Sequence, residues 1–197
     1  ACMKASLKKG EVVTLPHVNT IADGTAVQTP GKKIFPYIQK NLDDIITIED
    51  DELIVAFLDM VENHKMIVEN SGLLTVAALK HLGVKDKRVV SILSGGNMDV
   101  ITMSSVVQQG LIFRDRIFTV SVLLPDKPGE LAKVSQTLAD VQGNVIKLEH
   151  NQFVTTNRSA AVELRITLEC FGTEHKEQII AALEKKGYKP RIVRTMI

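Results

Sequence analysis

The segment from residue 160 to residue 170 alternates apolar side chains with mainly polar ones, and this pattern limits the fold more than any other feature of the chain. A repeat of two residues places alternate side chains on opposite faces of a β-strand. The segment is therefore predicted to be a half-buried antiparallel strand. Its apolar set is Ala160, Val162, Leu164, Ile166, Leu168 and Cys170.

The residues around this strand predict the rest of a small α+β domain. Pro128 and Gly129 favour a helix start, because proline presets the backbone of the first helical turn. The order βαββαβ indicates a four-stranded sheet with two helices on one face, the ferredoxin-like arrangement. The predicted elements are a strand at 117–124, a helix from 128, strands at 145–150 and 160–170, a helix at 174–186 and a strand at 190–197.

The preceding part of the chain has a different pattern, in which predicted helices alternate with predicted strands. Residues 43–48 form a short predicted strand, and residues 87–93 are a nearly continuous apolar run. Such a run is typical of a parallel strand that is buried on both faces. We therefore predict an α/β domain over residues 1–112 and the α+β domain over residues 116–197.

The balance of charges argues against several classes of partner. The 197 residues carry 24 Lys and Arg against 23 Asp and Glu, a net charge of +1, so we expect no nucleic acid and no membrane as partner. No apolar run approaches the ~20 residues that cross a bilayer. Cys2 and Cys170 have no metal-ligand spacing, so we predict no metal site and a reduced, cytoplasmic protein.

Residues 91–99, SILSGGNMD, place a serine and two glycines directly after the apolar run. Open parallel sheets bind ligands at the carboxyl ends of their strands, and glycine lets a ligand approach the backbone. A plain Gly-Gly turn explains the same residues. Two further segments are equally ordinary alone: TIADG at 20–24 contains an Asp-Gly turn, and VENSG at 68–72 places a capping carboxylate at a helix start.

Together, these three segments have the order and approximate spacing found in the threonine and serine dehydratase family, which the chain resembles over about residues 1–112. That family includes the eukaryotic serine racemases and uses the fold type II pyridoxal-phosphate scaffold. DDIIT at 43–47 and MKAS at 3–6 resemble two further motifs of the family. The resemblance implies that an α/β fragment of a fold type II enzyme precedes the α+β domain.

The resemblance also implies roles for individual residues. Ser94 would face the pyridine nitrogen of pyridoxal 5′-phosphate, and a hydroxyl leaves that nitrogen neutral, which suits β-elimination of water. Glu69 would belong to the polar surround of the ring, and Asp23 would lie near the substrate. The residues implied for the cofactor site are Ser94, Gly95, Gly96, Asn97, Glu69 and Gly24.

The sequence departs from the family pattern in the part that carries the chemistry. It has no match to S-F-K-x-R-G, which holds the Schiff-base lysine, or to the glycine-rich phosphate loop. We therefore expect the C-terminal part of a longer enzyme, with no catalytic residue of its own, no retained cofactor and no activity in isolation. Whole enzymes of this kind convert L-threonine to 2-oxobutanoate and ammonia; a serine dehydratase or racemase is the alternative.

Residues 124–131, LPDKPGEL, followed by Gly143 and Asn144, resemble an ACT domain, a regulatory amino-acid-binding module with the order βαββαβ. Amides at a helix start can hold a carboxylate. The resemblance implies an effector, isoleucine or valine, between two modules and hence a homo-oligomer. A non-catalytic module that senses amino acids and dimerises is the alternative. The implied effector site is Asp126, Pro128, Gly129, Glu130 and Asn144.

Overall fold

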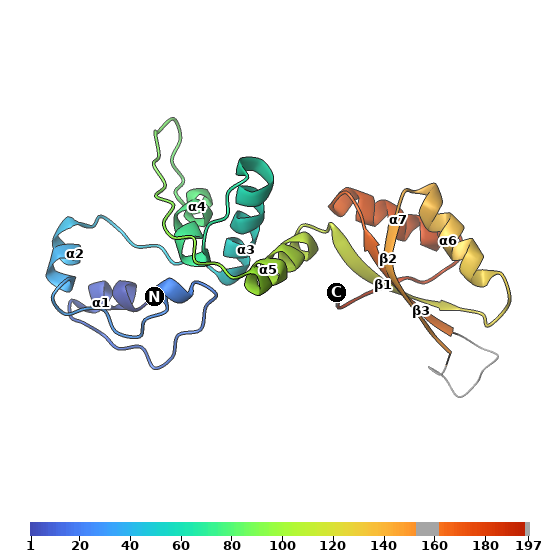
Figure 1. Cartoon of the computed structure of the whole chain (residues 1–197), viewed down its shortest axis with the longest axis horizontal. Coiled ribbons are helices and arrows are strands. Elements are labelled where there is room, and N and C mark those ends of the chain that lie inside the picture. The colour runs from blue at the N-terminus through green and yellow to red at the C-terminus, as the bar shows by residue number, and fades with distance from the viewer. Residues whose placement is uncertain (153–161, 196–197) are drawn as a thin grey trace. The chain divides into compact units, whose positions relative to one another are not determined.

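The computed structural model describes residues 1–152 and 162–195, and the chain divides into two compact units (Figure 1). Unit 1 is Ala1–Val107 and unit 2 is Gln108–Ile197. Helix α5 (Val100–Phe113) runs through the boundary between them. The domain limits proposed from the sequence remain predictions.

Unit 2 contains a four-stranded antiparallel sheet with the strand order β2-β3-β1-β4. Its two helices, α6 and α7, pack against the same face of the sheet (Figure 1). This topology confirms the predicted ferredoxin-like α+β fold. The elements are β1 (Ile117–Leu124), α6 (Glu130–Asp140), β2 (Asn144–Asn151), β3 (Val162–Glu169), α7 (Thr173–Lys185) and β4 (Arg191–Val193).

The apolar core of unit 2 lies between the sheet and these two helices. Leu164 and Ile166 of β3 are fully buried, whereas Glu163 and Arg165 at the alternate positions are partly exposed. The period-two prediction is therefore confirmed from residue 162 onward, while Ala160 lies outside the described residues. Burial of each apolar side chain of this size contributes about 1.5–3 kcal/mol.

The two edges of the sheet are short or irregular. In β2, Val145 pairs with Leu168 and Lys147 pairs with Thr167, so Ile146 is an extra residue that forms a β-bulge. At the opposite edge, β4 has three residues and is shorter than predicted. The long, regular strands β1 and β3 therefore occupy the middle of the sheet.

Unit 1 consists of helices joined by irregular segments. Its first helix ends at Gly10, whose φ of 80° is the left-handed conformation that glycine adopts readily. Helix α3 begins with a reciprocal capping box between Glu49 and Glu52. Leu53 and Phe57 lie at the centre of the core of this unit. The helices are α1 (Cys2–Lys9), η1 (Asp23–Thr25), α2 (Phe35–Asn41), α3 (Asp50–Asp59), η2 (Met60–His64), η3 (Asn70–Leu73), α4 (Leu74–Ala77), η4 (Ala78–His81) and the first part of α5.

The two strands predicted in unit 1 are not formed. Residues 43–48 and 87–93 have no regular secondary structure, and neither pairs with a strand in the described part of the chain. The apolar run was predicted to be buried on both faces, but Val90 and Ile92 are 88% and 71% exposed. A strand forms only where a neighbouring strand accepts its backbone hydrogen bonds, and an apolar pattern does not report whether that neighbour is present.

Candidate functional site

Glu69 joins two of the three motif segments of unit 1. It directly precedes the short helix η3, and its side chain accepts a hydrogen bond from the Asn97 backbone amide at 3.2 Å. Its own backbone amide donates to the Gly95 carbonyl oxygen at 3.4 Å. These two contacts hold the SGGN loop, Ser94 to Asn97, against the VENSG segment.

Close packing requires glycine at two positions of this site. A methyl group at Gly95 would come within 2.1 Å of the Glu69 carboxyl carbon, and Gly95 has a φ of 81°. A methyl group at Gly72 would come within 1.9 Å of the Ser94 carbonyl oxygen, whereas one at Gly96 would meet nothing within 4 Å. The SGGN loop is therefore packed against the protein on one side, and Ser94 and Gly96 are exposed.

The TIADG segment reaches the same site through Gly24. A methyl group at Gly24 would lie 2.8 Å from Ser71 Oγ and 3.6 Å from Glu69 Oε1. The Asn70 side-chain amide donates to the Ile21 carbonyl oxygen at 3.0 Å, which ties TIADG to VENSG. The structure therefore brings Gly24, Glu69 and the SGGN loop into one region, as expected if the three segments contribute to one binding site.

Two polar groups at this site differ in whether the described residues give them a hydrogen-bond partner. The Asp23 carboxylate is exposed and accepts the Gly24 backbone amide at 2.8 Å, a contact within its own turn. Ser71 Oγ is buried and has no hydrogen-bond partner in the described part of the chain. An unpaired buried hydroxyl costs about 1–3 kcal/mol, which a polar ligand atom can offset.

Four of the five predicted effector residues of unit 2 lie together at the start of α6. Gly129 directly precedes this helix with a φ of 90°, and a methyl group there would meet nothing within 4 Å. Asp126 and Pro128 are exposed, and Glu130 forms an ion pair with Lys133 at 2.7 Å. The loop before α6 is thus open.

Asn144 lies at the opposite end of the sheet from these four residues. It pairs with Glu169, which pairs with Ile117 at the start of β1, whereas α6 follows the end of β1. A strand of this length spans roughly 23 Å. The Asn144 side-chain amide donates instead to Glu169 at 3.0 Å. A single chain therefore does not bring Asn144 to the start of α6.

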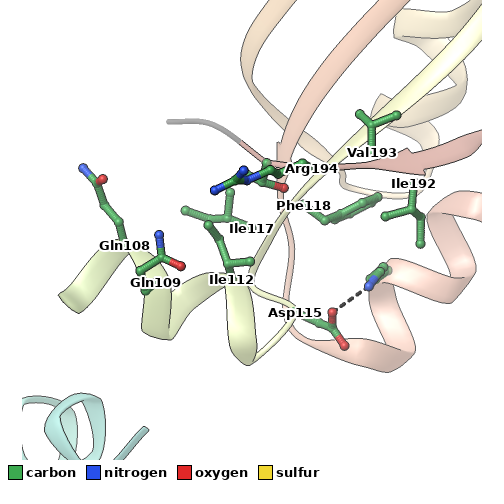
Figure 2. Close-up of a pocket in the computed structure, with 11 residues that line it drawn as sticks. Gln108, Gln109, Ile112, Asp115, Ile117, Phe118, Ile192, Val193 and Arg194 are labelled. Atoms are coloured by element: carbon green, nitrogen blue, oxygen red, sulfur yellow. Dashed lines mark hydrogen bonds and ion pairs between the residues drawn. The ribbon is translucent and has the colours of Figure 1, made fainter. Parts of the chain in front are cut away.

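The sequence patterns did not indicate the pocket of unit 2 that Figure 2 shows. This pocket has a volume of about 470 Å³ and is lined by residues from the end of α5, the start of β1, α7 and β4. Its charged residues are Asp115, Lys176 and Arg194, which belong to no sequence motif. Only the fold places them together.

No group of three or more His, Cys, Asp or Glu residues that could hold a metal ion occurs within residues 1–152 and 162–195. Among the helices of those same ranges, none is long and apolar enough to cross a membrane. The cytoplasmic location remains a prediction.

Comparison with known families assigns different families to two parts of the chain. Residues 1–95 match the family described as pyridoxal-phosphate dependent enzyme, and residues 118–187 match the ACT domain. The L-threonine ammonia-lyase of Geobacter sulfurreducens is 36% identical over 185 residues, which are 93% of this chain and 46% of that protein. The chain belongs to the threonine ammonia-lyase and dehydratase family.

Two other members of this family are also similar to the chain. The biosynthetic L-threonine dehydratase of Haemophilus influenzae is 34% identical over 194 residues, 95% of this chain and 36% of that protein. The solved structure of processed threonine deaminase isoform 2 from Solanum lycopersicum covers 55% of this chain and 33% of its own, with 31% identity and a TM-score of 0.52. The chain spans less than half the length of these relatives.

The site of unit 1 fits one side of the cofactor that this family uses. The SGGN loop offers an exposed Ser94 hydroxyl next to backbone that carries no side chain at Gly95 and Gly96. A flat aromatic ring can lie against such a surface. The Ser71 hydroxyl beside Gly24, which has no hydrogen-bond partner among the described residues, adds a polar group that a ligand can bind.

Proposed function

We propose that the chain is the C-terminal part of a threonine ammonia-lyase, which converts L-threonine to 2-oxobutanoate and ammonia under control of its ACT domain. The observation that carries this proposal is the convergence of Gly24, Glu69 and the SGGN loop in a chain similar to threonine ammonia-lyases. Pyridoxal 5′-phosphate, when bound, supplies the electron sink that makes the α-proton of the substrate acidic.

The residues of this chain position the ring and the substrate in the proposed enzyme. Ser94 would hydrogen-bond the ring nitrogen and leave it unprotonated, while Gly95 and Gly96 would leave room for the ring. Glu69 keeps the loop in place, because it accepts the Asn97 amide and packs on Gly95.

The proposal also assigns a residue beside the substrate and states where the lysine that moves the proton must come from. Asp23 borders the substrate in the proposed enzyme. The chain has no match to the Schiff-base lysine motif, so we propose that it is active only as part of a longer cytoplasmic protein.

A chimeric enzyme tests this proposal. The region of the Geobacter sulfurreducens lyase that aligns with this chain is replaced by the chain, and formation of 2-oxobutanoate from L-threonine is measured. We expect activity, with a loss of about tenfold or more in a Ser94→Ala chimera because one ring hydrogen bond is removed. Ser94 is exposed, so this variant keeps the fold, and Lys185→Ala in α7 is the matched control.

Three outcomes separate the proposal from its alternatives. A chimera that shows the cofactor absorbance but forms no 2-oxobutanoate contradicts the proposal. Conversion of L-serine to D-serine in place of elimination supports the racemase alternative. A Ser94→Ala chimera with unchanged activity removes the role assigned to that hydroxyl.

The second candidate function is a non-catalytic amino-acid sensor that dimerises through its ACT domain. The observation in its favour is that unit 2 has a complete sheet and a closed core of its own. Isoleucine or valine would bind at the start of α6, and Asn144 would come from a second copy. Val145, Ile146 and Leu148 expose an apolar strip on the edge strand β2 that suits such pairing.

Calorimetry and ultracentrifugation test this second function. Heat of binding with isoleucine or valine that Gly129→Leu abolishes would support the site, since the bulkier side chain fills the open loop. Sedimentation of the chain as a monomer, unchanged by Ile146→Lys, would contradict dimerisation through β2.

A further inference from the structure

The pocket in Figure 2, here called the α5 pocket, combines cations with an apolar floor. It lies entirely within unit 2, at the end of the sheet where β1 begins. The start of α6, where the effector is proposed to bind, follows the other end of β1. The α5 pocket therefore shares no residue with either of the two sites discussed above.

The negative charge of the α5 pocket is already paired by the protein. Lys176 Nζ lies 2.6 Å from Asp115 Oδ1, the contact dashed in Figure 2. The Thr173 hydroxyl donates to Asp115 Oδ2 at 2.8 Å. The Lys176 hydrogen bond holds the pKa of Asp115 below its ordinary value, so this residue is an anion at neutral pH. Lys176 uses one donor on Asp115, and an ammonium has three.

Arg194 supplies a second cation to the lining of the α5 pocket. It follows β4 directly, is exposed, and makes no ion pair or hydrogen bond with any residue in the ranges that the structure describes. In Figure 2 its side chain extends from β4 toward the last turns of α5. With Lys176 and Asp115, the lining carries one positive charge in excess.

The floor of the α5 pocket is apolar. Ile117 and Phe118 lie at the start of β1, and Ile192 contributes from β4. Gln108 and Gln109, little more than one turn before the end of α5, add side-chain amides that can donate hydrogen bonds. The volume of about 470 Å³ lies within the range of roughly 300–1,000 Å³ that is typical of pockets for small molecules.

We propose that the α5 pocket binds a small aliphatic carboxylate, whose carboxylate pairs with Arg194 and whose hydrocarbon body lies on Ile117, Phe118 and Ile192. Guanidinium groups bind carboxylates through two parallel hydrogen bonds. A ligand with a net charge of −1 neutralises the excess charge of the lining, whereas a zwitterionic amino acid does not. The ammonium of an amino acid would also compete with Lys176 for Asp115.

The ligand class therefore includes 2-oxo acids in preference to the amino acids with the same carbon skeleton. An occupant would contact residues of α5, β1 and β4 at once. Binding would then stabilise the end of α5 against the ACT domain. This inference does not depend on the proposed catalytic function, because all of its residues belong to unit 2.

Calorimetric titration of the 197-residue chain tests the proposal with matched probes. The probes are the 2-oxo acid with the carbon skeleton of isoleucine, isoleucine itself, and butylamine, which lacks a carboxylate. We expect the 2-oxo acid to bind more tightly than isoleucine and butylamine not to bind. Arg194→Gln should weaken binding of the 2-oxo acid about tenfold or more, because a charge-assisted hydrogen-bond pair is lost.

Arg191→Gln is the control, since Arg191 is an exposed cation of the same strand segment that does not line the α5 pocket. Both arginines are exposed, so neither variant is expected to unfold the chain. Equal weakening by the two variants, or no binding of the 2-oxo acid, overturns the proposal. Binding that Gly129→Leu abolishes and Arg194→Gln leaves intact also overturns it, and instead places the ligand at the start of α6.

Discussion

Units 1 and 2 have apolar cores built from similar side chains, but they differ in whether their extended segments pair with neighbouring strands. In unit 2, each strand pairs with a neighbour in one antiparallel sheet. In unit 1, the apolar segment at 87–93 finds no pairing strand among the described residues and exposes Val90 and Ile92. The difference shows that an apolar run in the sequence does not by itself bury the side chains that it carries.

Truncation of one isoleucine in each unit gives the strongest test of this comparison. Ile166→Ala removes a fully buried side chain from the middle of the sheet, so we expect a loss of about 2–5 kcal/mol in the free energy of unfolding. Ile92→Ala removes a side chain that is 71% exposed, and we expect a change within about 0.5 kcal/mol. Urea unfolding followed by circular dichroism measures both, and equal losses would break the comparison.

Substitution of one glycine probes how firmly the SGGN loop is held in unit 1. In Gly95→Ala, the new methyl group would clash with the Glu69 carboxylate, and alanine would have to adopt a left-handed backbone conformation. We therefore expect the free energy of unfolding to fall by about 2 kcal/mol. Gly96→Ala is the control for stability, because its methyl group meets nothing within 4 Å. Hydrogen exchange of the η3 amides reports the effect, and similar exchange in both variants would show that the loop is not packed as described.

The acid dependence of unit 1 gives the smallest expected effect. The ion pair with Lys80 and the hydrogen bonds from the Glu49 backbone and His81 lower the pKa of Glu52 from 4.5 to about 2. A lowered pKa in the folded state stabilises unit 1 above about pH 4.5, and this contribution is lost as the pH falls through about 2. The stability difference between the native chain and Glu52→Gln should therefore shrink over that range in urea titrations. A constant difference would contradict it.

The fold of unit 2 was predictable from its sequence because its signals are local. The alternation at 162–170 specifies a strand and its buried face, and Pro128 with Gly129 marks the start of α6. Burial is also set by partners that no local pattern reports. Thr167 occupies a polar position of the alternation and is nevertheless buried, and the pairing of its hydroxyl with that of Thr119 at 2.9 Å offsets the cost of burying it.

Contacts between distant segments were predictable only in part. The family resemblance grouped Gly24, Glu69 and the SGGN loop, and the structure places them together. The resemblance to an ACT domain grouped Asn144 with Gly129 at an interface between two modules, and this grouping stays a prediction because one chain alone holds the two residues at opposite ends of the sheet. No pattern in the sequence predicted the α5 pocket, because its charged residues come from three separate segments of the chain.

The bulge at Ile146 and the brevity of β4 have a consequence for assembly. Open-ended growth of a β-fibre requires long, regular strands at the sheet edges, onto which successive chains can add without limit. One edge of this sheet is interrupted after Val145, and the other has only three residues in its ladder. Both edges of the ACT sheet therefore offer a poor template for the open-ended addition of further chains.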